Sequence, residues 1–229
     1  MRKSGLSFWL AISLLFILMS ASSVNQKRNR IVFFGDSITE SGVKPGGYID
    51  VMNKMLAEQK LENSYELIGA GVSGNKIYDL YLRMEEDVLV KKPNIVVIYI
   101  GVNDVWHKQS SGTGTDADKF EKFYSAIITR LKQENIKVVL CTPAAIGEKT
   151  DFSNQQDGDI NKYSNIIRSL AKKNGLPLVD LRKAFLEYNL RNNPENKEQG
   201  ILTTDRVHLN ETGNKFVAEE MWKVLRTFS

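Results

Sequence analysis

Three short segments that lie far apart in this chain carry side chains able to cleave an acyl ester. They are Gly-Asp-Ser at 35–37, Gly-Val-Asn-Asp at 101–104 and Asp-Arg-Val-His at 205–208. Ester cleavage by a serine needs a nucleophilic hydroxyl, a base that accepts its proton, a carboxylate that orients the base, and N–H donors for the oxyanion. The three segments hold one candidate for each of these roles.

Ser37 is the candidate nucleophile. It follows the apolar run 31–34 at a predicted turn from strand to helix. At such a turn the serine N–H is free and points the same way as the side chain, so Ser37 could supply both the attacking oxygen and one oxyanion donor. The alternative is that Ser37 only caps the following helix. We interpret Asp36 as a carboxylate that fixes the turn, because in an extended chain it points away from the Ser37 side.

His208 is the candidate base, and Asp205 is close enough in sequence to hold the other nitrogen of its ring. Imidazole is the side chain whose usual pKa suits proton transfer near neutral pH. The alternatives are a surface histidine in a capped loop or a pair of metal ligands. No His-rich or Cys-rich cluster completes a zinc shell, so we predict no metal and no cofactor. The other histidine, His107, is expected to be exposed to solvent or to line a pocket wall.

Asn103 and Gly74 are candidate oxyanion donors. Asn103 lies just beyond the most apolar predicted strand, and its carboxamide offers an N–H that carries no titratable charge. An Asx turn at the strand end is the alternative for Asn103. Gly74 would let a backbone N–H approach the substrate without a side chain in the way.

The elements that must position these residues alternate between short apolar runs and amphipathic stretches. We expect strands at 31–34, 65–68, 95–100, 137–142 and 177–181, and helices at 48–59, 77–90, 118–135, 160–173, 182–188 and 211–227. This alternation predicts an α/β domain with a parallel sheet covered by helices on both faces. Ligand sites in such sheets lie at the carboxyl ends of the strands, which is where Ser37 and Asn103 fall.

The first residues differ from the rest of the chain. Arg2 and Lys3 precede an uncharged apolar run at 6–19, and small residues follow it. This order is typical of a secretory signal peptide. We therefore predict a signal peptide at 1–23 and one domain at 24–229, secreted or otherwise extracytoplasmic and without stable membrane association. The alternative is an uncleaved N-terminal anchor, because the apolar stretch is about long enough to cross a bilayer.

Composition and charge narrow the range of partners. The chain is 42% hydrophobic and 25% charged, with a formal charge of +4. Removal of Arg2 and Lys3 would leave 29 basic against 27 acidic residues, or +2. The remaining charges are scattered, so we expect no nucleic-acid partner. The single cysteine, Cys141, lies in an apolar run and is expected to be buried in a strand.

Taken together, these residues resemble the SGNH hydrolases, also called GDSL esterases/lipases. Four blocks carry the resemblance in the order that the family has them: 35–39 (GDSIT), 72–75 (VSGN), 101–104 (GVND) and 205–208 (DRVH). Together they span nearly the whole predicted domain. The Gly-x-Ser-x-Gly elbow of α/β-hydrolases is absent from the sequence.

The resemblance implies a catalytic triad of Ser37 as nucleophile, His208 as base and Asp205 as the group that orients the base. It also implies an oxyanion hole formed by the Ser37 N–H, the Gly74 N–H and the Asn103 side chain. The fold that it implies is a three-layer α/β/α sandwich on a five-stranded parallel sheet, the flavodoxin-like SGNH hydrolase fold.

Two polar segments, 106–116 and 147–159, are expected to be variable loops near the site. With no long apolar insertion to form a lid, they favour a hydrophilic alcohol and a short acyl group, and Trp106 could stack on a sugar or line an acyl pocket. We therefore expect a serine esterase that cleaves short-chain, acetyl-type esters on a carbohydrate or small molecule through an acyl-enzyme. The alternatives are a lysophospholipase, thioesterase or acyltransferase using the same site, or a non-catalytic carbohydrate-binding protein.

Overall fold

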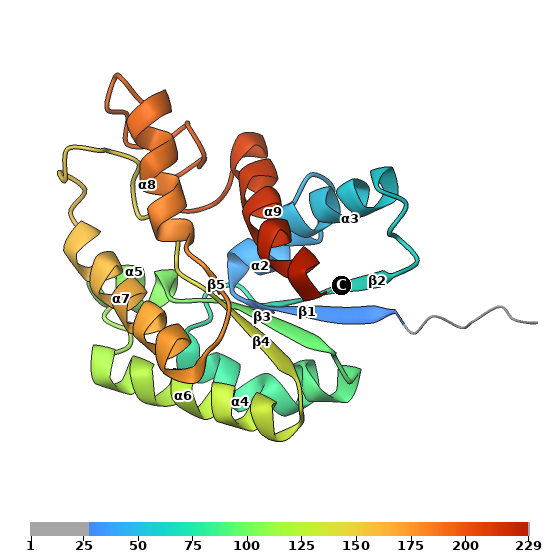
Figure 1. The fold of residues 1–229 in the computed structure, drawn as a ribbon. Coiled ribbons are helices and arrows are strands. Elements are labelled where there is room, and N and C mark those ends of the chain that lie inside the picture. The colour runs from blue at the N-terminus through green and yellow to red at the C-terminus, as the bar shows by residue number, and fades with distance from the viewer. Residues whose placement is uncertain (1–27, 229) are drawn as a thin grey trace, which may run out of the picture.

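The sheet at the centre of the molecule has five parallel strands in the order β2-β1-β3-β4-β5, as Figure 1 shows for this computed structural model of residues 28–228. The strands are β1 (Asn29–Gly35), β2 (Tyr65–Gly71), β3 (Ile95–Tyr99), β4 (Lys137–Cys141) and β5 (Leu178–Val179). This is the strand order of flavodoxin-like sheets. The predicted fold class is therefore confirmed.

Helices cover both faces of the sheet (Figure 1). On one face α3 packs against α9, with α2 and α8 beside them, and α4, α6 and α7 cover the other face. The helices are α2 (Ser37–Gly42), α3 (Tyr48–Glu58), α4 (Ile77–Asp87), α5 (Val102–Ser110), α6 (Ala117–Gln133), α7 (Asp157–Asn174), α8 (Leu181–Asn192) and α9 (Glu211–Leu225), with short 3₁₀ turns η1 (Leu89–Lys91) and η2 (Arg226–Phe228).

The apolar sequence of the central strands follows from this layering. Residues 31–34 of β1 and all of β3 are buried, because helices cover both faces of each strand. Cys141 is buried in β4 as a free thiol, as the sequence predicts. The long helices bury one apolar stripe each; on α6 it consists of Phe120, Tyr124, Ile127, Ile128 and Leu131.

Several expected elements differ from the structure; α8, for example, ends four residues later than predicted, at Asn192. The segment 106–116 was predicted as a loop, but its first part belongs to α5, which begins at Val102. The prediction was wrong because α5 buries only its first turn, 102–105, and shows no apolar stripe beyond it. β5 is shorter than predicted, and α7 begins three residues earlier than predicted, at Asp157.

The predicted signal peptide at 1–23 lies outside the described residues. From residue 28 to residue 228, no helix is both long and apolar enough to cross a bilayer.

The topology reverses at β1, which lies between β2 and β3. Gly35 at the end of β1 is in register with Gly71 of β2 on one side and with Tyr99 of β3 on the other. The turns after these three strands therefore start side by side at one edge of the sheet. Such a switch point is where α/β sheets bind ligands.

Candidate active site

Ser37 is the first residue of α2, and only Asp36 separates it from the end of β1. The Asp36 carboxylate accepts a hydrogen bond from the Ile38 N–H at 3.0 Å, so Asp36 caps the helix and fixes the turn as predicted. Ser37 is therefore not the cap, and its hydroxyl is left for another partner.

That partner is His208, which comes from the other end of the chain. Ser37 Oγ lies 2.9 Å from His208 Nε2, and His208 Nδ1 lies 2.7 Å from Asp205 Oδ2. The other Asp205 oxygen accepts the backbone N–H groups of His208 at 2.7 Å and Val207 at 3.1 Å. The structure thus brings the three predicted triad residues into one hydrogen-bonded chain. In this geometry an imidazole can take the proton of the serine while the carboxylate holds its other nitrogen.

The two carboxyl groups beside this chain differ in pKa. Partial burial acts to raise the pKa of Asp205, but hydrogen bonds from the His208 ring and from the two backbone amides outweigh it and hold the pKa below its usual range. Burial raises the pKa of Asp36 to about 7; the Ile38 N–H opposes this rise, nearby Asp104 adds to it, and His208 opposes it. The carboxylate that faces the imidazole is thus the more acidic of the two.

The turn that holds Gly74 is fixed to both neighbouring elements. Glu40 of α2 accepts the Ser73 N–H at 2.7 Å, and Asn103 Nδ2 donates to the Asn75 carbonyl at 3.1 Å. Gly74 has a φ of +77°, and nothing lies within 4 Å of where a Cβ would be, so backbone conformation rather than space favours glycine here. The turn after β2 is therefore bound to the segments that carry Ser37 and Asn103.

Each predicted oxyanion donor has at least one N–H hydrogen that is not used in a hydrogen bond within the described residues. Among the described residues, the N–H groups of Ser37 and Gly74 donate to no acceptor. Asn103 is 2% exposed, and one of its two Nδ2 hydrogens is donated to the Asn75 carbonyl, which leaves the other hydrogen available. Donors that are fixed in advance and not consumed by the protein are what an oxyanion site requires.

A buried carboxylate supports the base loop, by which we mean residues 193–210 between α8 and α9. Glu148 is 1% exposed and accepts the backbone N–H groups of residues 201–203 at distances between 2.6 and 2.8 Å. One residue earlier, the Gly147 N–H donates to the Arg206 carbonyl at 2.9 Å. The base loop is thus attached to the segment after β4 at 201–203 and at Arg206, both shortly before His208.

Sequence reasoning missed this role of Glu148. The polar segment 147–159 was expected to be a variable loop, yet Glu148, Asn154 and Gln156 in it are buried. A single glutamate in a polar stretch carries no local pattern that distinguishes a buried acceptor from a solvated side chain. The role of Glu148 becomes visible only in the folded structure, which brings residues 201–203 next to it.

The remaining aromatic and imidazole groups of α5 border the site. The Trp106 ring lies edge-on to the His208 ring, with centroids 6.3 Å apart. His107 makes no hydrogen bond to Ser37 and is partly buried on α5. Burial lowers the pKa of His107, and the positive charge of nearby Lys76 lowers it further. Across residues 28–228, no three His, Cys, Asp or Glu side chains form a metal-binding group.

Comparison with known proteins agrees with this arrangement. Residues 33–216 match the GDSL-like Lipase/Acylhydrolase family. An acetylxylan esterase of Geobacillus stearothermophilus is 28% identical over 207 residues, which cover 82% of this chain and 90% of the relative.

Solved structures are similar as well. The acetyl xylan esterase AlAXEase is 68% identical with a TM-score of 0.84, covering 85% of this chain and 98% of that one. A catalytic mutant of Axe2, an acetylxylan esterase from G. stearothermophilus, is 25% identical with a TM-score of 0.75, covering 86% of this chain and 94% of that one. The chain therefore belongs to the GDSL-like lipase/acylhydrolase (SGNH hydrolase) family, and it is a carboxylic ester hydrolase.

Proposed function

We propose that this protein is an exported serine esterase that removes acetyl groups from a carbohydrate through an acyl-enzyme on Ser37. The observation that carries the proposal is the hydrogen-bonded chain from Ser37 Oγ through His208 to Asp205, beside N–H groups without an acceptor. This combination supplies every group that acyl transfer to a serine needs.

In the first half of the reaction, Ser37 Oγ attacks the ester carbonyl carbon while His208 Nε2 accepts the serine proton. A C–O bond forms and the carbonyl electron pair moves onto the oxygen. The Ser37 and Gly74 N–H groups and the Asn103 carboxamide donate to this oxyanion. When the tetrahedral intermediate collapses, the bond to the sugar oxygen breaks and His208 returns the proton to that oxygen.

In the second half, water attacks the acetyl-serine and His208 again accepts the proton. Collapse of the second intermediate releases acetic acid and restores the Ser37 hydroxyl. Asp205 keeps the His208 ring in the tautomer that presents an unprotonated Nε2 to the serine. Since Asp205 and His208 lie three residues apart on the base loop, the acid moves with the base when that loop shifts.

The choice of substrate rests on two observations. The side chains around the triad are mainly polar: apart from Trp106 and the exposed Phe152, the nearby segments 106–116 and 147–157 present amides, hydroxyls and charges. The relatives described above are acetylxylan esterases. Both favour a short acyl group on a sugar over a long acyl chain, which would need a continuous apolar surface.

A series of p-nitrophenyl esters from acetate to palmitate tests the acyl preference, and acetate release from acetylated xylan tests the alcohol. We expect the highest kcat/KM on acetate and measurable release from xylan. A preference for palmitate would replace this proposal with a lysophospholipase. Labelling of Ser37 by a fluorophosphonate, located by peptide mass spectrometry, tests the acyl-enzyme, and labelling elsewhere would contradict it.

Export depends on the proposed signal peptide at 1–23, which precedes the proposed domain at 24–229. Expression in a secreting host followed by N-terminal sequencing tests it. We expect the mature chain to begin at Ser23 or Val24. Recovery of the intact chain from the membrane fraction would instead indicate an N-terminal anchor.

A further inference from the structure

A polar hollow of about 400 Å³ lies beside the triad, between α5, the segment after β4 and the base loop. Its lining includes Trp106, Gln109, Gln155, Gln156, Glu198 and Arg206. We propose that this hollow is a glycan subsite, which binds an uncharged sugar residue adjoining the acetylated one. The inference rests on the proposed function and adds to it where the rest of the carbohydrate lies.

The hollow is joined to the reacting groups through two of its residues. Trp106 lies edge-on to the His208 ring, and Arg206 comes two residues before His208 in the base loop. A sugar bound here would therefore neighbour the ester whose leaving oxygen receives the His208 proton. A large, rigid indole offers contact area at little entropic cost, and the face of its ring suits the C–H face of a pyranose.

Charge in the hollow favours a neutral ligand. Its one cation, Arg206, is paired with Glu198 at 2.9 Å, and the other lining residues carry no charge. A carboxylate or phosphate would have to compete with Glu198 for the guanidinium. A neutral polyol can instead accept from the guanidinium and donate to the carboxylate with the pair intact.

The uncharged lining residues suit vicinal hydroxyl groups. Within residues 28–228, Gln109 and Gln155 are exposed and make no side-chain hydrogen bond. Gln156 is buried and fixed, since its Nε2 donates to the Val105 carbonyl at 3.2 Å. An amide both donates and accepts, and a few fixed polar groups around one aromatic side chain are typical of sites that orient a polar ligand.

The fold holds the backbone of Arg206 in an uncommon conformation. Arg206 has a φ of +80°, in the left-handed region that a residue with a Cβ rarely adopts. The Gly147 N–H donates to its carbonyl at 2.9 Å and so supports the conformation from outside the base loop. Strained residues held by their surroundings are frequent at ligand sites.

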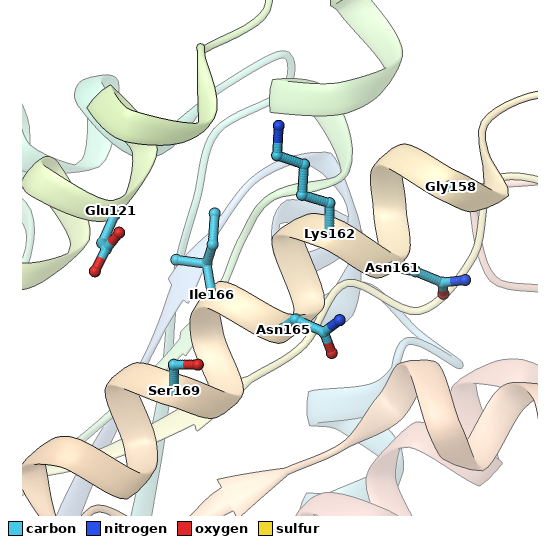
Figure 2. Close-up of a pocket in the computed structure, with 7 residues that line it drawn as sticks. All are labelled: Glu121, Gly158, Asn161, Lys162, Asn165, Ile166 and Ser169. Carbon is cyan, nitrogen blue, oxygen red and sulfur yellow. The ribbon is translucent and has the colours of Figure 1, made fainter.

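A second hollow, of about 510 Å³, provides a contrast (Figure 2). It lies between α6 and α7, and its lining includes Glu121 of α6 and Lys162, Asn165 and Ile166 of α7. It is larger and is also lined mostly by residues with polar side chains, but none of them belongs to the base loop or to the turns that carry Ser37 and Asn103. Its residues therefore supply a matched control.

The test compares kcat/KM on an acetylated xylo-oligosaccharide with kcat/KM on p-nitrophenyl acetate for the wild type, Gln109→Ala, Arg206→Ala and the control Lys162→Ala. For the first two variants we expect the ratio of the two values to fall about tenfold, mostly through KM, since each loses one or two hydrogen bonds to the sugar. Lys162→Ala should match the wild type on both substrates. Unchanged ratios in Gln109→Ala and Arg206→Ala would overturn the subsite.

The two proposals fail differently in this experiment. A wild-type enzyme that cleaves p-nitrophenyl acetate but not the oligosaccharide would refute the carbohydrate function itself. A wild type that cleaves both, with variants of unchanged ratio, would refute the subsite alone. Far-ultraviolet circular dichroism of each variant identifies a loss of fold, which would lower both rates together and leave their ratio unchanged.

A binding measurement gives a second, independent readout. In the described part of the chain the tryptophans are Trp106 and the buried Trp222. Titration of Ser37→Ala protein with unacetylated xylo-oligosaccharide should change its fluorescence saturably, and adding Trp106→Phe should remove the change. No saturable change at millimolar sugar, or the same change after Trp106→Phe, would contradict sugar binding at this hollow.

Discussion

Ser37 follows β1, a strand that pairs on both sides and is buried over residues 31–34, whereas His208 lies in a stretch with no helix and one isolated bridge, between Thr203 and Leu209. The nucleophile is thus placed by the hydrogen bonds and packing of the sheet. The base is placed by a few polar contacts, chiefly those of Glu148 with the backbone of 201–203. The two regions meet where Ser37 Oγ lies 2.9 Å from His208 Nε2.

The difference shows that one buried carboxylate can give an irregular segment the fixed geometry that a strand has by pairing. Three N–H groups that converge on Glu148 would be left unsatisfied in the interior without it, which costs more than each bond contributes. Changes in the base loop should therefore affect catalysis while the sheet stays folded. Changes near Ser37 should affect catalysis and the core together.

Removal of either reacting group should have the largest effect. We expect Ser37→Ala and His208→Ala each to lower kcat on p-nitrophenyl acetate by about 10³-fold or more, because either change abolishes the acyl-enzyme route. Steady-state assays with thermal unfolding of both variants measure this. Both proteins should stay folded, because Ser37 is only partly buried and its hydroxyl bonds to His208 rather than to the core. Near wild-type turnover in a folded Ser37→Ala protein would reject the mechanism.

Asp205→Ala should have a smaller effect on kcat than either of these changes, of roughly 10²-fold. Alanine removes the charge that stabilises the imidazolium and the acceptor that fixes the tautomer, while the base and the nucleophile remain. The same assay across pH 5 to 9 measures it. A loss as large as that of His208→Ala would show that the orienting carboxylate matters as much as the base.

Glu148→Gln should lower kcat by about tenfold without contact between Glu148 and the substrate. The amide has one acceptor oxygen in place of two, so part of the 201–203 backbone loses its partner and the His208 position broadens. A matched control is Glu40→Gln, which loosens the exposed Ser73 contact on the sheet side. Kinetics of both variants with pH profiles measure the contrast, and equal effects would remove the distinction between the two regions.

How far the sequence predicted this site depends on the range of each interaction. Asp36, Ser37 and Asn103 were predictable because each follows an apolar strand, and parallel strands place such turns at one edge. The Asp205–His208 pair was predictable because it is local. Glu148 was not, since its partners lie more than 50 residues away and polar residues in loops have no periodicity.

The elements divide in the same way. The apolar runs of β1, β3 and β4 identified buried strands, and the stripe of α6 identified a helix. α5 escaped prediction because its buried first turn includes the polar Asn103 and Asp104, whose burial follows from the site rather than from hydrophobicity. Where function buries a polar side chain, hydropathy no longer reports the fold.

The pH dependence of stability, which leaves kcat aside, also separates the two regions. The pKa of Asp36 is raised by burial from its usual value of 3.8 to about 7, so between these values the folded protein keeps a proton that the unfolded chain releases. Stability from this group is full below about pH 4 and is lost as the pH rises toward 7. The lowered pKa of Asp205 has the opposite sign: its contribution is present above pH 3.8 and is lost as the pH falls further.

Asp36→Asn keeps a neutral side chain that can still accept from the Ile38 N–H, and it cannot ionise. Relative to the wild type, its free energy of unfolding should therefore rise by roughly 2–4 kcal/mol between pH 4 and pH 8, from about 1.4 kcal/mol for each unit of pKa shift. Urea unfolding of both proteins at the two pH values measures the change. Asp205→Asn in the same experiment should show only a much smaller change, of opposite sign, because the folded-state pKa of Asp205 lies below this range and its unfolded-state value of 3.8 lies just beneath the lower limit. If the free energies of unfolding of the two variants changed with pH in parallel, the pKa of Asp36 would not be raised above that of Asp205.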